Sequence, residues 1–433
     1  MLAWRKGFYG YVIAASAFSV YLLLGGCYYG LSVLAPVMAD DLGWSATASG
    51  AAFSIFAILV GLSSPLAGAF VVRFGPRLSI LIGSISMATA LALLSTTTAI
   101  WQLYAFVILL GVGMALGVTL PLQQLVGNWF VIRRSLFLGL VLTGAGVGGL
   151  VITSLTSSLV GALGSWRTVW LVLAGVTLLP GLLALFFIRN RPEELGQKAD
   201  GATHDQNLQT GAPAQRQASR VHKTKHQWEV KAAIRTPAFW LVSVSNGIMF
   251  FLLQATTAHQ VAYLTSEAGM ELGIAASALG LIAGSSIIGR LVAGWLGDRM
   301  EPRFVIAGLH LLLGLSLLIL ISGQGLVTLY VYVVLFGIGY GGMIVLAPTT
   351  MLNYFGSMNY AAIMGIASPT ATVLGAVSPL LVGGIKDGSG SYLPAFVLMM
   401  GFTVVGAVCA FLARPPAREA AGTAQVDLRD VAR

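Results

Sequence analysis

Long apolar stretches, separated by short polar segments, run through almost the whole of this 433-residue chain. A helix needs about 20 apolar residues to cross the apolar layer of a membrane. Stretches of spanning length lie at residues 11–36, 47–72, 78–99, 101–126, 135–160, 167–188, 238–263, 273–297, 304–321, 326–350, 360–384 and 393–413. The pattern therefore predicts an all-α membrane protein in which 12 transmembrane helices form two six-helix bundles.

One polar stretch separates the first six spans from the last six. It is rich in Gln, Ala, Lys, Arg and His and has no sustained apolar period, so we expect most of it to be disordered. The predicted organisation is an N-terminal bundle at 1–188, a cytoplasmic connector at 189–237, a C-terminal bundle at 238–413 and a cytoplasmic tail at 414–433.

The last part of the connector, HQWEVKAAIRTP, is expected to form a short interfacial helix with Trp228 and Ile234 toward lipid. Three histidines, His204, His222 and His226, also lie in the connector, and we interpret them as solvated loop residues and not as metal ligands. We expect no metal and no cofactor.

Composition and charge agree with a membrane protein. Hydrophobic residues make up 57% of the chain and charged residues 9%, and the mean hydropathy is +0.86. With both termini in the cytoplasm, only Arg167 and Lys386 of the 24 Lys and Arg lie outside, and Arg290 lies within a span. The positive-inside rule therefore predicts a multi-pass cell-membrane protein with cytoplasmic termini. The net charge of +9 reflects this sidedness, so the expected partner is the lipid bilayer, with no nucleic acid and no obligate protein partner.

The two sets of six spans are related by an internal repeat. A shift of 226 residues places Gly68, Arg73 and Arg77 on Gly294, Arg299 and Arg303. The same shift pairs Gly111 with Gly337, Gly113 with Gly339, Gly139 with Gly365, Gly149 with Gly375, and 164–166 with 390–392. Parallel repeats of this kind place a binding site between the two halves, near the middle of the membrane. The glycine-rich runs GVGMALG, TGAGVGG and FGIGYGG lie inside apolar spans, where they let helices approach closely; they are not nucleotide loops.

Arg290 is the charged residue that lies deep inside a span. Eight residues separate it from Asp298, the next charge along the chain, so it lies about 12 Å from the boundary of the apolar layer. An arginine at that depth costs on the order of 3 kcal/mol even on a mild insertion scale, which favours a functional role. No Asp or Glu lies within the predicted spans, so the expected counterion is a visiting carboxylate, held by two parallel hydrogen bonds. The alternative is a guanidinium tied to an internal carboxylate or to backbone carbonyls.

Several polar residues at similar depth are candidates for the same pocket. Tyr340, within GIGYGG, is expected to donate to a carboxylate or to an alpha-hydroxyl group. The other candidates are Tyr28, Tyr29, Thr119, Asn246 and Gln254, each of which could instead form hydrogen bonds between helices. His259, near the outer end of its helix, is the proton-coupling candidate, with a packing role as the alternative. His310 is interpreted as structural.

Two ten-residue segments resemble the paired loop motif of the major facilitator superfamily. These are GAFVVRFGPR at 68–77 and GWLGDRMEPR at 294–303. The resemblance implies the major facilitator fold and gating roles for Gly68, Arg73, Arg77, Gly294, Asp298, Arg299 and Arg303. The first copy has Val72 where an acid is usual.

Further segments resemble the monocarboxylate transporter branch of that superfamily and its bacterial relatives, including oxalate/formate exchangers. They are WFVIRRSLFLGLVLTGAGVGG at 129–149, GFYGYV at the start of the first span, HQVAYL at 259–264, and the arginine of the eighth span. Cys27 stands where animal members have a lysine, and Ser286 where they have an aspartate. Residues 360–385 lack the second cation of oxalate-type exchangers, so one fixed positive charge matches one carboxylate.

The predicted function is secondary active transport of small monocarboxylates such as lactate or pyruvate, coupled to a proton, by alternating access between the bundles. The alternatives are an exchanger or exporter of organic anions or dicarboxylates, and a membrane sensor that binds a carboxylate without transporting it. No metal cluster, nucleophile triad or nucleotide motif is visible in the sequence, so we do not expect an enzyme.

Overall fold

A computed structural model describes residues 7–44, 46–201, 221–224, 226–323 and 325–416 of the chain. Within these ranges, 12 helical segments are long and apolar enough to cross a membrane, which confirms the predicted all-α class and number of spans. The N-terminal six spans comprise α1 (Gly10–Leu42), α2 (Ala46–Phe74), α3 (Pro76–Leu94), α4 (Ile100–Met114) continuing through the π-helix η1 (Ala115–Thr119) into α5 (Leu120–Trp129), α6 (Arg134–Leu163) and α7 (Trp166–Phe186). The C-terminal six are α9 (Pro237–Ser266), α10 (Leu272–Gly297), α11 (Pro302–Ser322), α12 (Leu326–Phe355), α13 (Tyr360–Ser389) and α14 (Leu393–Leu412).

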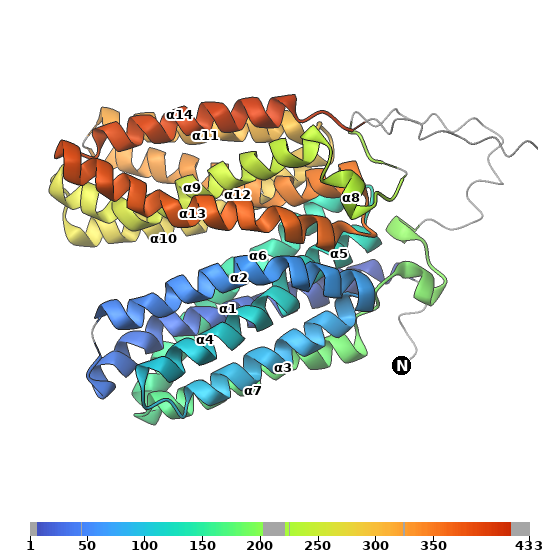
Figure 1. Cartoon of the computed structure of the whole chain (residues 1–433), viewed down its shortest axis with the longest axis horizontal. Coiled ribbons are helices and arrows are strands. Elements are labelled where there is room, and N and C mark those ends of the chain that lie inside the picture. Colours follow the sequence, from blue (N-terminus) through green and yellow to red (C-terminus); the bar gives the residue numbers. More distant parts are fainter. Residues whose placement is uncertain (1–6, 45, 202–220, 225, 324, 417–433) are drawn as a thin grey trace, which may run out of the picture.

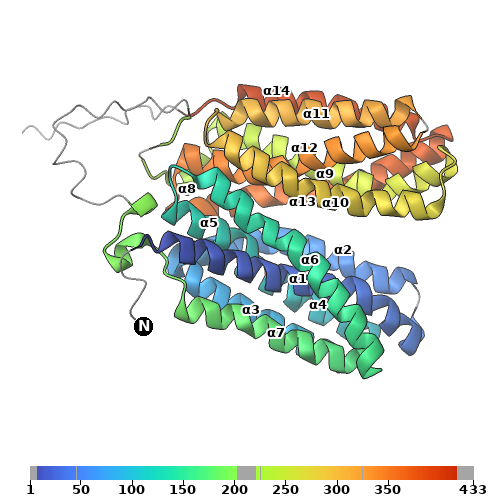
Figure 2. The ribbon, with the colours of Figure 1, turned by 180° about the vertical axis from the view of Figure 1, so that it is seen from behind.

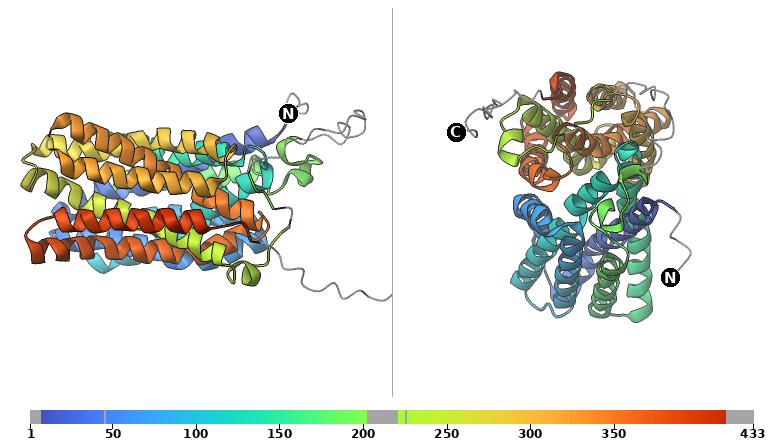
Figure 3. Two further views of the ribbon diagram at one scale, coloured as in Figure 1. Left: turned by 90° about the horizontal axis from the view of Figure 1, so that it is seen from above. Right: turned by 90° about the vertical axis from the view of Figure 1, so that its right-hand side faces the viewer.

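The helices form two bundles that lie side by side, α1 to α7 in one and α9 to α14 in the other (Figure 1). The reverse view and the end-on view show the same division (Figure 2, Figure 3). The short helix α8 (Val230–Ala233) lies at the end of the molecule where α1 begins, which we call the connector end. The ribbons of the two bundles approach each other at the connector end and diverge toward the opposite end.

The internal repeat predicted from the sequence is visible in matching interactions. Arg77 donates through Nη2 to the carbonyl of Leu185 at 2.5 Å, and Arg303 donates through Nη1 to the carbonyl of Phe411 at 3.5 Å. Both partners are related by the same shift of 226 residues. In each bundle the arginine thus binds a backbone carbonyl near the end of the last helix.

A second repeated interaction lies at the opposite end. Trp166 donates through Nε1 to Asp41 at 2.9 Å, and the amide of Tyr392 donates to Glu267 at 2.9 Å. These pairs also differ by 226 in both members. Because the contacts repeat and not only the residue types, the two bundles are built on the same plan.

Glycines allow the bundles to touch at symmetric positions. A Cβ atom added at Gly139 of α6 would lie 2.6 Å from the carbonyl oxygen of Arg290, and one at Gly365 of α13 would lie 2.5 Å from that of Ser64. Real Cβ atoms do not approach so closely, so glycine is required at both crossings. Residues 139 and 365 are repeat equivalents, and so are 64 and 290. Arg290 therefore occupies the position that a serine fills in the first half.

The described part of the connector packs against protein. It contains two short 3₁₀ turns, η2 (Pro192–Leu195) and η3 (Ala199–Gly201), and α8. Trp228 packs edge-on against Phe355 with ring centroids 5.6 Å apart, and Ile234 packs against the same hydrophobic cluster. Both side chains are half-buried by these contacts, and the expectation that they face lipid stays a prediction. Residues 202–220 of the connector, including His204, and residues 417–433 of the tail lie outside the described ranges.

Candidate functional site

Arg290 lies on α10, seven residues before the helix ends at Gly297, and its side chain is 8% exposed. Nη1 donates to the carbonyl oxygen of Leu142 at 2.9 Å, and Nε has no hydrogen-bond partner in the described structure. Leu142 belongs to α6, so the bond joins the two bundles. The ion pair found among the described residues is Lys386–Glu267, which leaves Arg290 without a carboxylate partner there.

This environment bears directly on the two interpretations of Arg290 from the sequence. One of the five N–H groups of the guanidinium donates to a backbone carbonyl. The interpretation in which backbone carbonyls bind Arg290 is therefore correct for one donor of the side chain. A buried arginine with an unpartnered Nε retains donors for an anion, and a carboxylate is the acceptor that matches them in shape and charge.

The glycines of α6 bring a tyrosine next to this guanidinium. A Cβ atom added at Gly146 would lie 3.6 Å from Nη1 of Arg290, and one added at Gly149 would lie 3.2 Å from Cε2 of Tyr29. Positions three apart share a helix face, with a rise of about 4.5 Å between them. Arg290 and Tyr29 therefore lie against the same face of α6, nearly one turn apart.

Two other tyrosines and a threonine complete this group. The Arg290 guanidinium is close enough to interact electrostatically with the hydroxyls of Tyr21 and Tyr29, both on α1. Thr119, the last residue of the π-helix, is within hydrogen-bonding reach of Tyr21. Tyr340 of α12 is 8% exposed and lies within electrostatic range of Tyr29. The structure thus gathers Arg290, Tyr340, Tyr29, Tyr21 and Thr119 from both bundles.

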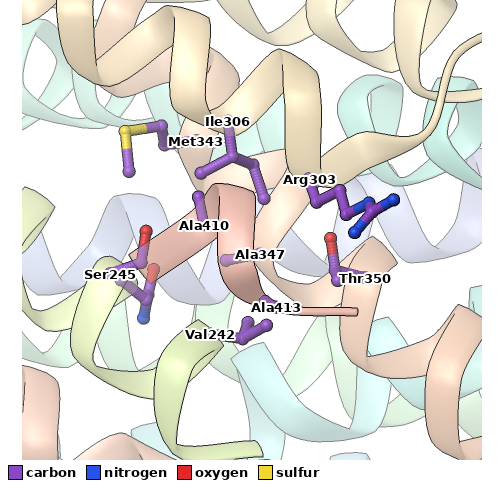
Figure 4. Close-up of a pocket in the computed structure, with 10 residues that line it drawn as sticks. Val242, Ser245, Arg303, Ile306, Met343, Ala347, Thr350, Ala410 and Ala413 are labelled. Atoms are coloured by element: carbon purple, nitrogen blue, oxygen red, sulfur yellow. The ribbon is translucent and has the colours of Figure 1, made fainter. Parts of the chain in front are cut away.

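The structure does not bring Asn246 into this group. Asn246 lies on α9 and lines a small cavity inside the C-terminal bundle, between α9, α11, α12 and α14. In the close-up view, Arg303 and Thr350 lie together on one side of the lining residues, away from Ser245 and Met343 (Figure 4). No residue of α10 lines this cavity, so it is distinct from the surroundings of Arg290.

Gln254 and His259 lie on α9 against α13. A Cβ atom added at Gly375 would lie 3.3 Å from Cγ of Gln254, whose side chain is exposed. The ring of His259 is half-buried, with Nε2 2.9 Å from the carbonyl of Pro379 and Nδ1 3.4 Å from the hydroxyl of Tyr392. His259 thus connects α9 with α13 and α14, and none of its described contacts reaches Arg290. The backbone of Tyr28 belongs to α1, but its side chain lies outside the described part of the structure.

The bundles are joined at the connector end by capping interactions. Asp298 accepts the amides of Ser135 and Leu136, at 2.9 and 3.1 Å, and so caps the start of α6 from the other bundle. Burial raises the pKa of the Asp298 carboxyl above its usual range, and the two amides oppose that rise. At the repeat-related place Val72 has no acceptor, and Gln124 instead accepts the amide of Ala361 at 3.1 Å. The missing acid of the first motif is therefore replaced by a glutamine from α5.

Connector residues hold the corner between α5 and α6 from two sides. Asp200 accepts the amides of Val131 and Ile132, at distances between 2.9 and 3.1 Å. Lys223 donates through Nζ to the carbonyls of the same two residues, at 2.7 and 2.8 Å. Burial lowers the pKa of the Lys223 ammonium group. Two residues after this corner, Arg134 donates to Asn353 of the other bundle at 3.2 Å. We call Asp200, Lys223 and the corner 131–132 the connector clamp.

The glycines among the remaining motif residues pack between the bundles, and the arginines lie over aromatic rings close by in the chain. Gly68 packs against the backbone of Ala361, and a Cβ atom added at Gly294 would lie 2.8 Å from the carbonyl oxygen of Ser135. The guanidinium of Arg299 lies over the ring of Trp295 at 3.9 Å, and that of Arg73 lies over Phe74 at 5.2 Å. His310 is fully buried, with Nδ1 3.2 Å from the carbonyl of Ile306.

Four features of the site were not predicted from the sequence: Tyr21, Leu142, Gly146 and the connector clamp. Tyr21 precedes Tyr29 by eight residues, close to two full turns and therefore on the same helix face, and this spacing would have identified it. Leu142 acts through its backbone carbonyl, for which the sequence has no marker. The partners of the clamp are distant in the chain and their pairing depends on how the bundles meet.

The Major Facilitator Superfamily matches residues 17–379, and a second match covers 286–431. The chain belongs to the Major Facilitator Superfamily, and it is a transporter and not an enzyme.

Its similarity to curated proteins is modest in identity but extends over most of the chain. It is 28% identical over 348 residues to monocarboxylate transporter 13 of Rattus norvegicus, covering 79% of this chain and 74% of the relative. It is 26% identical over 369 residues to monocarboxylate transporter 12 of Homo sapiens, covering 81% and 70%. It is 25% identical over 367 residues to the oxalate:formate antiporter of Oxalobacter formigenes, covering 82% and 80%. These similarities agree with the branch to which the sequence motifs pointed.

Solved structures share the fold at low sequence identity. A crystal structure of FucP, a transporter of the same superfamily in the outward conformation, aligns with a TM-score of 0.70 at 15% identity, covering 93% of this chain and 99% of that one. The crystal structure of the human organic anion transporter MFSD10 aligns with a TM-score of 0.70 at 15% identity, covering 93% of this chain and 99% of that one. The major facilitator fold is thereby confirmed.

Proposed function

We propose that this protein is a secondary active transporter of small monocarboxylates, resembling lactate or pyruvate in size, which it moves together with a proton by alternating access. The observation that supports this most is the environment of Arg290. Its guanidinium is buried where the two bundles meet. Among the described residues it has no acidic partner, and its Nε has no hydrogen-bond partner. One carboxylate neutralises one guanidinium, and desolvation strengthens the pair. Two of the similar proteins are named monocarboxylate transporters, which agrees with a monocarboxylate as cargo.

We place the connector end in the cytoplasm. Of the 24 Lys and Arg, all but Arg167, Lys386 and Arg290 belong to that end or to the segments beyond it. Such a bias sets membrane orientation through the positive-inside rule. In this orientation the hydrogen bonds that join the bundles in the described structure lie toward the cytoplasm. The carrier is then in the state that receives its cargo from outside.

Proton coupling is assigned to His259. Its ring is half-buried near the outer end of α9, with Nε2 2.9 Å from the carbonyl of Pro379 on α13 and Nδ1 3.4 Å from the hydroxyl of Tyr392 at the start of α14. A histidine changes charge in the physiological pH range, so its protonation can alter these contacts.

The decisive experiment is the substitution Arg290→Lys. The lysine keeps the positive charge but loses the planar pair of donors, so we expect lactate uptake into proteoliposomes to fall at least about tenfold. Arg191→Lys, at an exposed position of the connector, is the matched control and should transport normally. Near-native uptake by the Arg290 variant would rule out the proposed role of the guanidinium.

A second candidate function is the exchange of organic anions or dicarboxylates, which the similarity to an oxalate:formate antiporter favours. Counterflow in liposomes separates the two. Uptake that requires an internal anion and ignores a pH gradient would establish exchange, whereas net uptake driven by a pH gradient alone supports symport. Binding of carboxylates without any flux would identify a sensor.

A further inference from the structure

Tyr29 is the most exposed of the residues that the structure gathers around Arg290. It is 40% exposed, whereas Tyr340 and Arg290 are each 8% exposed. It also belongs to the N-terminal bundle, whereas Arg290 and Tyr340 belong to the C-terminal one. The exposed tyrosine therefore faces the guanidinium from the other half of the protein.

The position of Tyr29 along the membrane normal is fixed by α6. Its ring lies against Gly149, and the guanidinium of Arg290 lies against Gly146. Because α6 runs from the connector end to the opposite end, Gly149 is about 4.5 Å farther from the connector end than Gly146. Tyr29 thus lies between Arg290 and the end toward which the bundles diverge.

A cargo whose carboxylate binds Arg290 must extend its remaining atoms somewhere. The connector side is closed by the contact of Gly139 with the backbone of Arg290 and by the bond from Arg290 to Leu142. The cargo atoms next to the carboxylate are therefore directed toward the opposite end, where Tyr29 lies. A phenolic hydroxyl both donates and accepts, so it can bind either a hydroxyl or a keto oxygen.

We propose that Tyr29 determines specificity by hydrogen bonding to the oxygen on carbon 2 of the cargo, so that the protein selects 2-hydroxy and 2-oxo acids over unsubstituted acids of the same length. This inference rests on the proposed function, because it needs a carboxylate on Arg290. The two bundles then bind different parts of one molecule: the C-terminal bundle binds the carboxylate and the N-terminal bundle binds the neighbouring oxygen.

The test uses the full-length protein and two acids that differ by one oxygen atom, L-lactate and propionate. Affinities are measured by calorimetry on purified protein, and transport by counterflow in liposomes. We expect the native protein to prefer L-lactate, and Tyr29→Phe to weaken lactate binding by roughly 3- to 10-fold while propionate binding stays unchanged. Retained propionate binding also shows that the variant is folded.

Tyr11→Phe is the matched control, because it makes the same change on the same helix at a position that is 60% exposed near the connector end. It should leave both affinities unchanged. Equal losses for both acids in Tyr29→Phe, or no loss for either, would overturn the inference while leaving the proposed function intact. Failure of the native protein to bind either acid would instead refute the proposed function.

Discussion

The guanidinium of Arg290 combines burial with incomplete hydrogen bonding. A single carbonyl of Leu142 is its described acceptor, although the side chain is 8% exposed. Buried polar groups are normally paired, and an unpaired one costs about 1–3 kcal/mol. The unpaired donor lies at the centre of the molecule, where an anionic cargo would accept its hydrogen bond and remove this cost.

His259 carries a prediction at the scale of one side chain. Glutamine in its place can still bond the carbonyl of Pro379 but cannot gain a proton. We therefore expect the variant His259→Gln to take up lactate at a rate that hardly changes with external pH, whereas native uptake rises as the outside becomes more acidic. The measurement is initial uptake from about pH 5.5 to 8, with His226→Gln in the exposed connector as control. An unchanged pH profile would leave His259 a packing residue.

At the scale of helices, the close crossing of α6 and α10 depends on Gly139. A methyl group at this position would lie 2.6 Å from the carbonyl oxygen of Arg290, so the two helices would have to separate. We expect Gly139→Ala to destabilise the state that is closed at the connector end by about 1–3 kcal/mol. Distances between spin labels placed on the two bundles at that end should shift toward longer values.

Gly161 provides the control for this substitution. It lies on the same helix, and a Cβ atom added there would meet no atom within 4 Å. Gly161→Ala should raise helix stability slightly and leave the label distances unchanged. Equal effects of both substitutions would show that helix propensity and not the crossing is responsible.

The elements also show what sequence patterns can and cannot predict. The twelve spans could be predicted from apolar runs, because a run that is long enough to cross the bilayer identifies a transmembrane helix. Thr119, by contrast, ends a π-helix that interrupts the span 100–129, and apolar runs do not distinguish an α-turn from a π-turn. The replacement of the acid at Val72 by Gln124 was likewise invisible, because Gln124 comes from another helix.

At the scale of the whole molecule, the connector clamp ties the chain between the bundles to the closed end. Removing the carboxylate in Asp200→Ala leaves the amides of Val131 and Ile132 without their acceptor. We expect the equilibrium to shift toward opening at the connector end by about 1–3 kcal/mol, again measured by label distances. Glu194→Ala, at an exposed position of the same connector, should have no effect.

Combining Asp200→Ala with Lys223→Met tests whether the two sides of the connector clamp act together. Coupled residues give a combined effect that differs from the sum of the single effects. Strict additivity would mean that Asp200 and Lys223 act independently.

The overall plan was more predictable than the site. A repeat of 226 residues predicts two equivalent bundles, and the arginine contacts to Leu185 and Phe411 follow from it. Arg290 could be identified from the sequence because its depth in the membrane follows from its position within one apolar run. Which groups surround it depends on the angle between the bundles, which no local pattern encodes. For this reason Tyr340 and Thr119 join Arg290 in the structure, whereas Asn246 lines a separate cavity.

The bond between Arg290 and Leu142 crosses from one bundle to the other. If the bundles rock apart around an empty centre, this buried cation loses its described acceptor, so we expect turnover without cargo to be slow. A carboxylate that takes up the freed donors removes this penalty. Labelled acid already loaded in a vesicle should therefore leave faster when unlabelled acid is present on the far side, a trans-stimulation that originates in one hydrogen bond.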